Sequence, residues 1–408
     1  MSIRKLRKPH EWLEADRLIA NAFLHDWDEE QERRKVREQA AGHVPRPEET
    51  WAFADDAGAL QTVVTTLSHR IWLAGRDLPV GEVHMVGSRM EHRGGGNVRA
   101  LMGAVLEDFR SRDDVFAVLI PFSFSFYRKF GFELATRTVR CQIPIEQLKG
   151  LSCGYEVTKV ETERDVGPVR ALHEDVARGR DMCLSFEEAD WQWRGNGMFG
   201  EPDFLDPDCQ THTYVLWNDK APVASVTFSF THEHDNPFFG KADVSDLTWR
   251  DPAALMGALG FLHRLRAKVG SVNVELPSGL DIASVLPEPD KVQCSLGGHV
   301  MARVLNAPEA LRAMPHPEGS GSYVLAVHDA LIPQNDGPWR VTFEAGEARV
   351  AEAPNEDPDL ELSEAALAQL ISGVTGLETA LLRKDVHVLK NHQTLVRVFT
   401  RRVSWLEL

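Results

Sequence analysis

The stretch GEVHMVGSRMEHRGGGNVRALM, residues 81–102, is the most informative part of the sequence. A strand pattern leads into Arg93 and three consecutive glycines, and a helical pattern begins at about Val98. Glycines let a backbone approach a ligand closely, and the N–H groups that open a helix attract anions. Arg93 and Arg99 can add charge-assisted hydrogen bonds to a phosphate. The pattern indicates a phosphate-binding loop, with a flexible strand-to-helix turn as the open alternative.

The residues around this stretch predict a mixed α/β domain over residues 1–150. Before it, the spacing predicts helices at 8–23 and 28–39 and strands at 51–54, 60–67, 70–73 and 82–87. After it, we expect a helix at 98–112, a buried strand at 115–120, a short helix through Tyr127 and a strand pair near 133–143. This order is typical of a mixed sheet with helices on both faces.

An internal repeat predicts a second unit over residues 151–292. Residues 100–121 (ALMGAVLEDFRSRDDVFAVLIP) and 254–277 (ALMGALGFLHRLRAKVGSVNVELP) both read as a helix, a charged turn and a buried strand that ends in proline. The second copy has no glycine loop, and Asp251 before its helix would repel a pyrophosphate. We therefore expect the central unit to be structural, without a cofactor of its own.

Residues 293–408 predict a third, different α/β domain. Strands are expected at 300–305, 323–327, 339–343 and 348–351, and helices from Pro308, at 364–371 and at 376–382. The apolar stretch 386–399 fits a helix and a strand equally well.

Composition limits the function. The 408 residues suit two or three domains, and 61 acidic against 45 basic residues give a net charge of −16. This balance argues against binding nucleic acid or anionic lipid and is compatible with a cationic partner. No signal peptide and no membrane-length apolar run is seen, and the five cysteines form no C-x-x-C pair. We expect a cytoplasmic protein in a reducing compartment.

Two motifs resemble the GNAT superfamily of N-acetyltransferases. Residues 93–97 fit its R-x-x-G-x-[GA] pyrophosphate loop, and Val98 departs from the last position. Residues 120–133 (IPFSFSFYRKFGFE) resemble its FY-x-x-x-GF element and, more narrowly, the Eis-like acetyltransferases, as do residues 92–102. That family implies two tandem GNAT-like units and a C-terminal domain that resembles sterol carrier protein. Residues 301–305 resemble the opening of that third domain.

The resemblance also implies roles for individual residues. Tyr127 would protonate the leaving thiolate of coenzyme A, and the carboxylate of Leu408 would take a proton from the amine. Acetyl-CoA would lie along Val86, Gly87, Ser88, Arg93, Gly94, Gly95, Gly96, Asn97, Val98, Arg99, Phe122 and Ser123. A cationic amine would meet Asp26, Trp27 and Glu407. Structural roles stay open as alternatives. Tyr127 could be a core aromatic residue, the tail with Leu408 could be disordered, and the segment with Asp26 and Trp27 could be a solvated acidic helix start.

The sequence predicts an acetyl-CoA-dependent N-acetyltransferase that transfers directly to a primary amine of a cationic small molecule, such as an aminoglycoside or a polyamine. The family implies a homo-hexamer. No metal is expected, because His232–Asp235 lacks a third spaced ligand. Two other functions stay open: acetylation of protein lysines or N-termini, and a non-enzymatic module that binds lipid or CoA esters.

Overall fold

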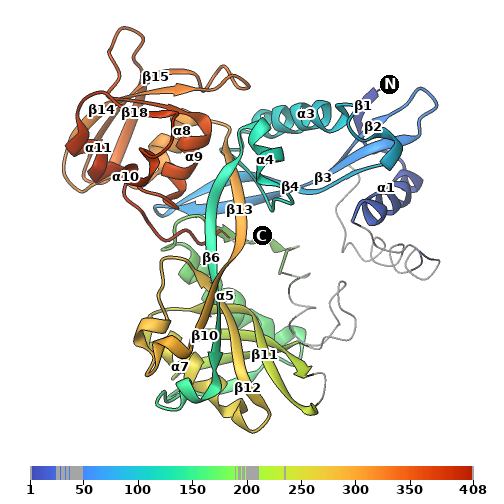
Figure 1. Cartoon of the computed structure of the whole chain (residues 1–408), viewed down its shortest axis with the longest axis vertical. Helices are drawn as coiled ribbons and strands as arrows, with labels where there is room; N and C mark the ends of the chain where they lie inside the picture. The colour runs from blue at the N-terminus through green and yellow to red at the C-terminus, as the bar shows by residue number, and fades with distance from the viewer. Residues whose placement is uncertain are drawn as a thin grey trace.

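A computed structural model of the chain describes residues 2–23, 49–188, 211–233 and 236–406, together with residues 28, 33, 36, 190, 191, 194 and 198. Over these residues, a 13-stranded sheet runs through the N-terminal and central parts, and a 5-stranded sheet forms the C-terminal part. Figure 1 shows the C-terminal part, orange to red, beside the blue N-terminal strands, with the central part below both. The predicted helix at 28–39 falls almost wholly outside the described residues.

The N-terminal part has the predicted mixed architecture. Its elements are β1 (Ser2–Lys5), α1 (Pro9–Ala22), β2 (Thr50–Ala54), β3 (Leu60–Leu73), β4 (Arg76–Ser88), α3 (Asn97–Ser111), β5 (Phe116–Leu119), α4 (Phe124–Tyr127) and β6 (Glu133–Pro144). The two strands predicted at 60–67 and 70–73 are one strand, because β4 pairs with β3 along its whole length from Thr62 to Leu73. The strand pair predicted near 133–143 is likewise the single strand β6.

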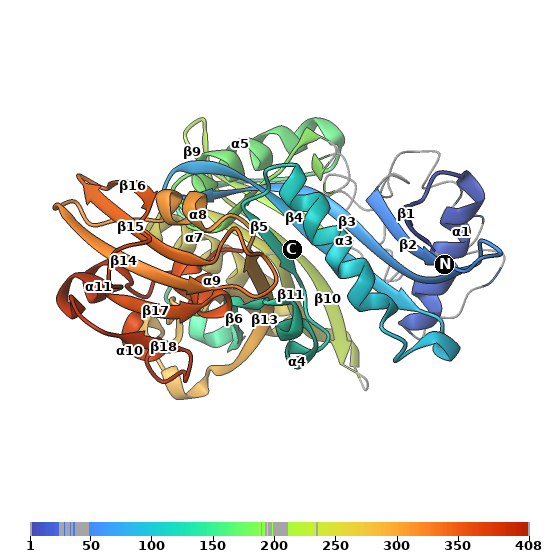
Figure 2. The ribbon, with the colours of Figure 1, turned by 90° about the horizontal axis from the view of Figure 1, so that it is seen from above.

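Helices cover both faces of this part of the sheet. Helix α3 buries Leu101, Met102, Val105 and Phe109 against one face, at the spacing of one helical stripe. Helix α1 covers the other face, where Leu18 packs with Val63 of β3. Figure 2 shows α3 crossing over β3 and β4, with α1 near the N-terminal end of the sheet.

The central part repeats the unit of strand, helix and parallel strand. Its elements are β7 (Glu156–Lys159), α5 (Val166–Ala177), β8 (Cys183–Ser185), β9 (His212–Asn218), β10 (Ala221–Glu233), β11 (Asn236–Trp249), α7 (Pro252–Leu262) and β12 (Val269–Pro277). Helix α7 joins the parallel strands β11 and β12, as α3 joins the parallel strands β4 and β5. The repeat that the sequence predicts is therefore a repeat of structure.

Strand β13 (Gln293–Val304) ties the N-terminal and central parts together. It lies between β5 and β6 in the large sheet, antiparallel to both. Figure 1 shows β6 and β13 running side by side from the upper to the lower half of the molecule. Residues 301–305, expected to open the third domain, thus complete the first sheet, and the predicted boundary at residue 293 stays a prediction.

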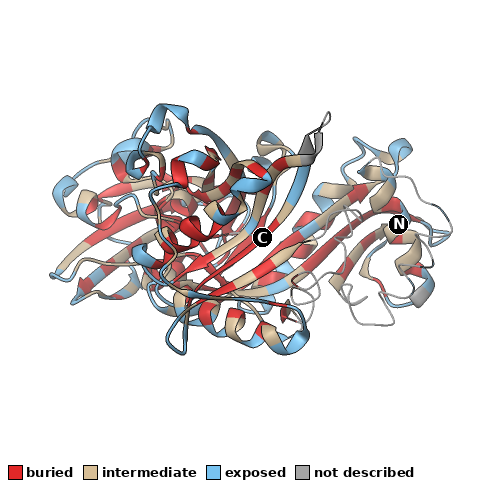
Figure 3. Cartoon of the chain, turned by 90° about the horizontal axis from the view of Figure 1, so that it is seen from below, coloured by how far each residue is buried: buried red, intermediate tan, exposed pale blue. Residues whose placement is uncertain are grey.

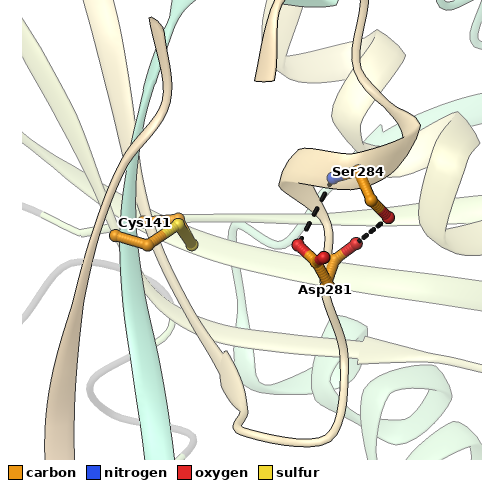
Figure 4. Close-up of a disulfide and its surroundings, with 4 residues drawn as sticks. Cys141, Asp281 and Ser284 are labelled. Carbon is orange, nitrogen blue, oxygen red and sulfur yellow. Dashed lines mark hydrogen bonds between the residues drawn. A yellow bond between two sulfur atoms is a disulfide. The ribbon is translucent and has the colours of Figure 1, made fainter. Parts of the chain in front are cut away.

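A disulfide joins these two strands, although the cysteine pattern predicted a reducing compartment. Cys141 of β6 and Cys294 of β13 are direct cross-strand partners, with 4.2 Å between their Cα atoms. Figure 4 shows this bridge beside a turn in which the Ser284 hydroxyl donates to the Asp281 carbonyl over 2.8 Å. Cys153 and Cys183 are not disulfide-bonded, and Cys209 lies outside the described residues. The cysteine pattern therefore no longer supports a reducing compartment.

The C-terminal part packs against the same face of the large sheet as α1. It comprises α8 (Ala307–Ala313), β14 (Gly321–His328), β15 (Gly337–Glu344), β16 (Glu347–Glu352), β17 (Leu360–Ser363), α9 (Glu364–Ser372), α10 (Leu377–Ala380), β18 (Val386–Val388) and α11 (His392–Val398). The ambiguous stretch 386–399 holds both a strand and a helix. One buried core contains Val80 and Val118 of the large sheet together with Leu325 and Val341 of the small one, and Figure 3 shows the buried residues in red.

Candidate active site

The parallel strands β4 and β5 separate at the centre of the large sheet. Their pairing covers Val80–Glu82 against Phe116–Val118 and ends there, although β4 continues to Ser88. The backbone of Val86–Ser88 is paired with β3 on one side, at Thr62–Val64. The other edge of this segment faces the opening between the strands. The structure thus gives Val86, Gly87 and Ser88 the free edge that a ligand could pair with.

The glycine loop lies where β4 ends, and it leaves the start of α3 open. Gly94 and Gly96 have φ angles of +80° and +86°, which side chains rarely adopt, and a Cβ at either position would meet no atom within 4 Å. Gly96 is the N-cap, and in the described part of the chain no side chain caps this helix. The first N–H groups of α3 are therefore available to an anion.

Charged and polar residues of the loop are placed for the same role. Arg93 and Arg99 are exposed, and the amide of Asn97 donates to Gln61 Oε1 over 3.3 Å. Val98 packs onto the core under α3. A cradle of open N–H groups with two exposed arginines fits a pyrophosphate.

Exposed apolar side chains follow the ends of β4 and β5. Met90 is 63% exposed, Ile120 59% and Phe122 68%. Ser123 caps the short helix α4 by accepting from Phe126 N–H over 3.3 Å. Because a folded chain seldom leaves several large apolar groups together in water, this surface favours an apolar ligand arm beside the β4 edge.

Tyr127 is buried at the end of α4 in an aromatic cluster. Its ring centroid is 5.3 Å from that of Phe122 and 5.1 Å from that of Phe126, both edge-on. It is 3% exposed, and burial raises the pKa of its hydroxyl to about 12. The phenol therefore keeps its proton through the neutral range and can act as a donor.

A cavity of about 1050 Å³ opens between α1 and the segment that follows β4. Its wall combines two predicted cofactor residues, Ser88 and Arg93, with residues of α1 such as His10, Glu14 and Arg17. The sequence did not predict a role for α1 in the site.

The C-terminal tail is docked, as its apolar composition predicts. Trp405 N–H donates to the Asp181 carbonyl over 3.0 Å, and the guanidinium of Arg180 lies 3.7 Å from the Trp405 ring centroid. Leu406 is fully buried in the core that contains Val80 and Val118. The predicted site residues Leu408, Glu407, Asp26 and Trp27 lie outside the described residues.

The equivalent helix of the central part is closed to anions. Asp251 caps α7 by accepting from Ala254 N–H over 2.9 Å. The carboxylate takes the place that a phosphate would need, which supports a structural role for this unit.

Sequence reasoning missed a cluster at the mouth of the opening. The carboxylate of Glu82 lies between His69 of β3 and His84 of β4, at 2.7 Å from a ring nitrogen of each. The E-x-H spacing of Glu82 and His84 was a local signal, because alternate strand residues share a face. The contribution of His69 depends on the pairing of β3 with β4.

Comparisons with known proteins agree with this geometry. Residues 2–135 match the family model described as an acetyltransferase (GNAT) domain. The chain carries a GNAT acetyltransferase domain. Residues 307–407 match the sterol carrier protein domain, so the predicted fold class is confirmed. The prediction that the protein is an N-acetyltransferase is confirmed as well, and GNAT domains use an acyl-CoA as donor.

Solved structures resemble the whole chain, not the GNAT domain alone. A GCN5-related N-acetyltransferase from Anabaena variabilis is 18% identical, with 99% of this chain and 98% of that chain covered and a TM-score of 0.83. A probable N-acyltransferase from Enterococcus faecalis (19% identity, 99% and 98%, TM-score 0.82) and Eis1 from Mycobacterium abscessus (17%, 99% and 98%, TM-score 0.81) are similar. At these identities the likeness shows the shared fold. No curated protein is similar enough in sequence to count as a match.

The described residues show neither a metal-binding cluster nor a helix that could span a membrane. No group of three or more His, Cys, Asp or Glu side chains there could hold a metal ion. Within the same residues, no helix is both long and apolar enough to cross a membrane.

Proposed function

We propose that this protein is an Eis-like, acetyl-CoA-dependent N-acetyltransferase that acetylates a primary amine of a cationic small molecule. The observation that carries the proposal is the uncapped, glycine-lined start of α3 beside the free edge of β4. The loop would bind the pyrophosphate of acetyl-CoA. The N–H groups of Val86–Ser88 would bond its pantetheine arm and polarise the thioester carbonyl. The exposed rim at Met90, Ile120 and Phe122 would cover the arm.

The amine would attack the thioester directly in a ternary complex. As the carbon–sulfur bond breaks, Tyr127 would give its proton to the leaving thiolate, which its buried and protonated phenol supports. The Leu408 carboxylate is the base that the family resemblance implies for the proton that nitrogen loses as the C–N bond forms, and it stays a prediction that deletion of Leu408 would test. An amine that is cationic in water suits the net charge of −16.

Thiol release from acetyl-CoA, measured with polyamines, aminoglycosides and lysine peptides as acceptors, tests the proposal. We expect release that depends on a small cationic amine and a kcat at least roughly 10²-fold lower in Tyr127→Phe. Tyr323→Phe is the matched control, because it removes a buried hydroxyl far along the chain in β14. Release with peptides alone would instead favour protein acetylation. Binding of acetyl-CoA without release to any amine would reject the proposal.

The assembly and the cellular setting are proposals of the same kind. We infer a homo-hexamer from the family resemblance, and the cytoplasmic setting stays a prediction from the sequence. Analytical ultracentrifugation of the full chain should give six times the chain mass of 45.7 kDa. A monomer at micromolar concentration would contradict it.

A further inference from the structure

Three titratable side chains meet beside the opening between β4 and β5 and have no part in the function proposed above. Glu82 is buried, and its two carboxylate oxygens have different partners. Its Oε2 lies 2.7 Å from His69 Nε2, and its Oε1 lies 2.7 Å from His84 Nδ1. The chain thus holds one carboxylate between two imidazoles.

The charge of Glu82 fixes the roles of the ring nitrogens. Burial alone would raise the pKa of Glu82, but the hydrogen bonds from His69 and His84 outweigh it and lower the pKa to about 2. An ionised carboxylate only accepts hydrogen bonds, so each ring donates an N–H to it. The proton of a neutral His84 therefore sits on Nδ1, and the lone pair sits on Nε2. An imidazole oriented in this way by a carboxylate is a general base.

The two histidines differ in exposure. The His69 side chain is 9% exposed, whereas that of His84 is 38% exposed. Burial alone would lower the pKa of His69, but the hydrogen bond and charge of Glu82, with the charges of Asp190 and Glu187, raise it. His69 therefore holds the Glu82 carboxylate from the buried side, and His84 is the histidine of the cluster that a bound molecule can reach.

A β-bulge places His84 next to the point where β4 and β5 separate. Thr66 pairs with Val83 and Thr65 with Met85, so His84 is the extra residue of a β-bulge. Bulges redirect side chains and are common beside active sites. The β4–β5 pairing ends at Glu82, so His84 comes directly after the point where the strands part. Val86, where the proposed thioester site begins, lies two residues beyond His84, or roughly 7 Å along the strand. An imidazole and one water can span that distance.

The cluster also lies on the face where the tail docks. Val80 and Glu82 point to the same face of β4, because alternate residues of a strand share a face. Val80 belongs to the buried core that contains Leu406. The cluster therefore lies on the sheet face that α1 and the C-terminal part enclose.

We propose that His84, oriented by Glu82 and anchored by His69, removes the proton that an acceptor ammonium must lose before it attacks the thioester. The inference rests on the proposed function. One N–H proton passes to His84 Nε2, directly or through one water, and then to solvent. The nitrogen lone pair forms the C–N bond, and the C–S bond breaks. The second proton leaves nitrogen once the C–N bond has formed and replaces the one that Tyr127 gives to sulfur, so the products are amide, free thiol and one released proton.

Chemical rescue tests this role of His84. With an acceptor that the wild type acetylates, we expect His84→Ala to lower kcat at least roughly 10²-fold without changing the Kd for acetyl-CoA. Added imidazole should restore part of the rate to His84→Ala but not to Tyr127→Phe. His387→Ala, which changes an exposed histidine of β18, is the control and should keep wild-type activity. A kcat within twofold of wild type in His84→Ala, with Tyr127→Phe impaired, would overturn the proposal and leave the acetyltransferase standing.

A second measurement needs no acceptor and separates the two proposals. ¹⁵N-correlated NMR of the histidine rings in the ligand-free protein should show neutral His84 with its proton on Nδ1. In Glu82→Gln, the His84 proton should no longer be confined to Nδ1, while the rest of the spectrum stays that of a folded protein. A His84 protonated on Nε2 in the wild type would reject the proposal even if no amine substrate is found.

Discussion

The guanidinium of Arg303 fills the space in which a side chain at Gly131 would lie. A Cβ at position 131 would overlap Arg303 Nη1, and Gly131 itself has a φ of +78°. Arg303 is fully buried on β13, and its Nη2 donates to both carboxylate oxygens of Asp329, over 2.7 and 3.0 Å. Since Gly131 follows Tyr127 by four residues, the turn that carries the proposed acid rests on a buried ion pair from the C-terminal half.

Gly131→Ala should be far more destabilising than an ordinary glycine substitution. The left-handed backbone costs about 1–2 kcal/mol for alanine, and overlap with a packed group adds about 1–3 kcal/mol. Gly58→Ala is the matched control, because Gly58 has a φ of +91° and open space around it. Urea unfolding should show a loss of about 1–2 kcal/mol for Gly58→Ala and a clearly larger loss for Gly131→Ala. Equal losses would mean that Arg303 moves aside at no cost.

A carboxylate at the start of α3 should weaken coenzyme A binding. Gly96→Asp would put a carboxylate at the N-cap of α3, the position that Asp251 has in α7. Gly96→Asn has nearly the same size and backbone demand without the charge, so it isolates electrostatic repulsion. By calorimetry at low salt, we expect Gly96→Asp to bind coenzyme A at least roughly tenfold more weakly than Gly96→Asn, with the difference shrinking in high salt. Equal affinities would show that the pyrophosphate binds elsewhere.

Local sequence signals predicted the elements around the site well. The helix stripe of Leu101, Met102, Val105 and Phe109 and the glycine loop before it are encoded within some twenty residues, where helical and strand periods differ clearly. Asp251 likewise predicted that the central helix would not bind a phosphate, and its cap on α7 explains why.

Features that depend on distant pairing escaped prediction. Strand β13 lies between β5 and β6 in the sheet, although it is far from both along the chain. Its Cys294 follows Cys141 of β6 by 153 residues. Periodicity reports only which face of an element is buried, not which strand becomes its neighbour. The Cys141–Cys294 bridge and the His69–Glu82 contact both depend on such neighbours, so neither could be derived from local spacing.

Removal of the Cys141–Cys294 bridge should lower the free energy of unfolding by about 2–5 kcal/mol, since it closes a long loop in the unfolded chain. The double variant Cys141→Ser/Cys294→Ser should unfold at lower urea concentration than the wild type. A reducing agent should bring the wild type to the same midpoint. Cys153→Ser, at a cysteine outside the bridge, is the control and should respond to reductant as the wild type does. An unchanged midpoint in reductant would contradict a stabilising bridge.

The His69–Glu82–His84 cluster should make stability depend on pH in two directions. The pKa of Glu82 falls from 4.5 to about 2 on folding, so the unfolded chain binds more protons and stability drops as pH falls below about 4.5. That shift corresponds to roughly 3 kcal/mol. The pKa of His69 rises above its usual 6.5, so its contribution is complete below about pH 6.5 and is lost at higher pH. The stabilisation by the cluster should therefore be greatest between about pH 4.5 and 6.5.

Glu82→Gln isolates this dependence. The difference in free energy of unfolding between wild type and Glu82→Gln should peak near pH 5.5 and shrink at pH 3 and at pH 9, as measured by urea titration. Glu107→Gln is the control, because Glu107 is an exposed residue of α3 that pairs with Arg110 at the surface, and surface pairs contribute about 0–1 kcal/mol. A flat difference across this range would mean that Glu82 is not ionised between the two histidines, and the orientation proposed for His84 would lose its basis.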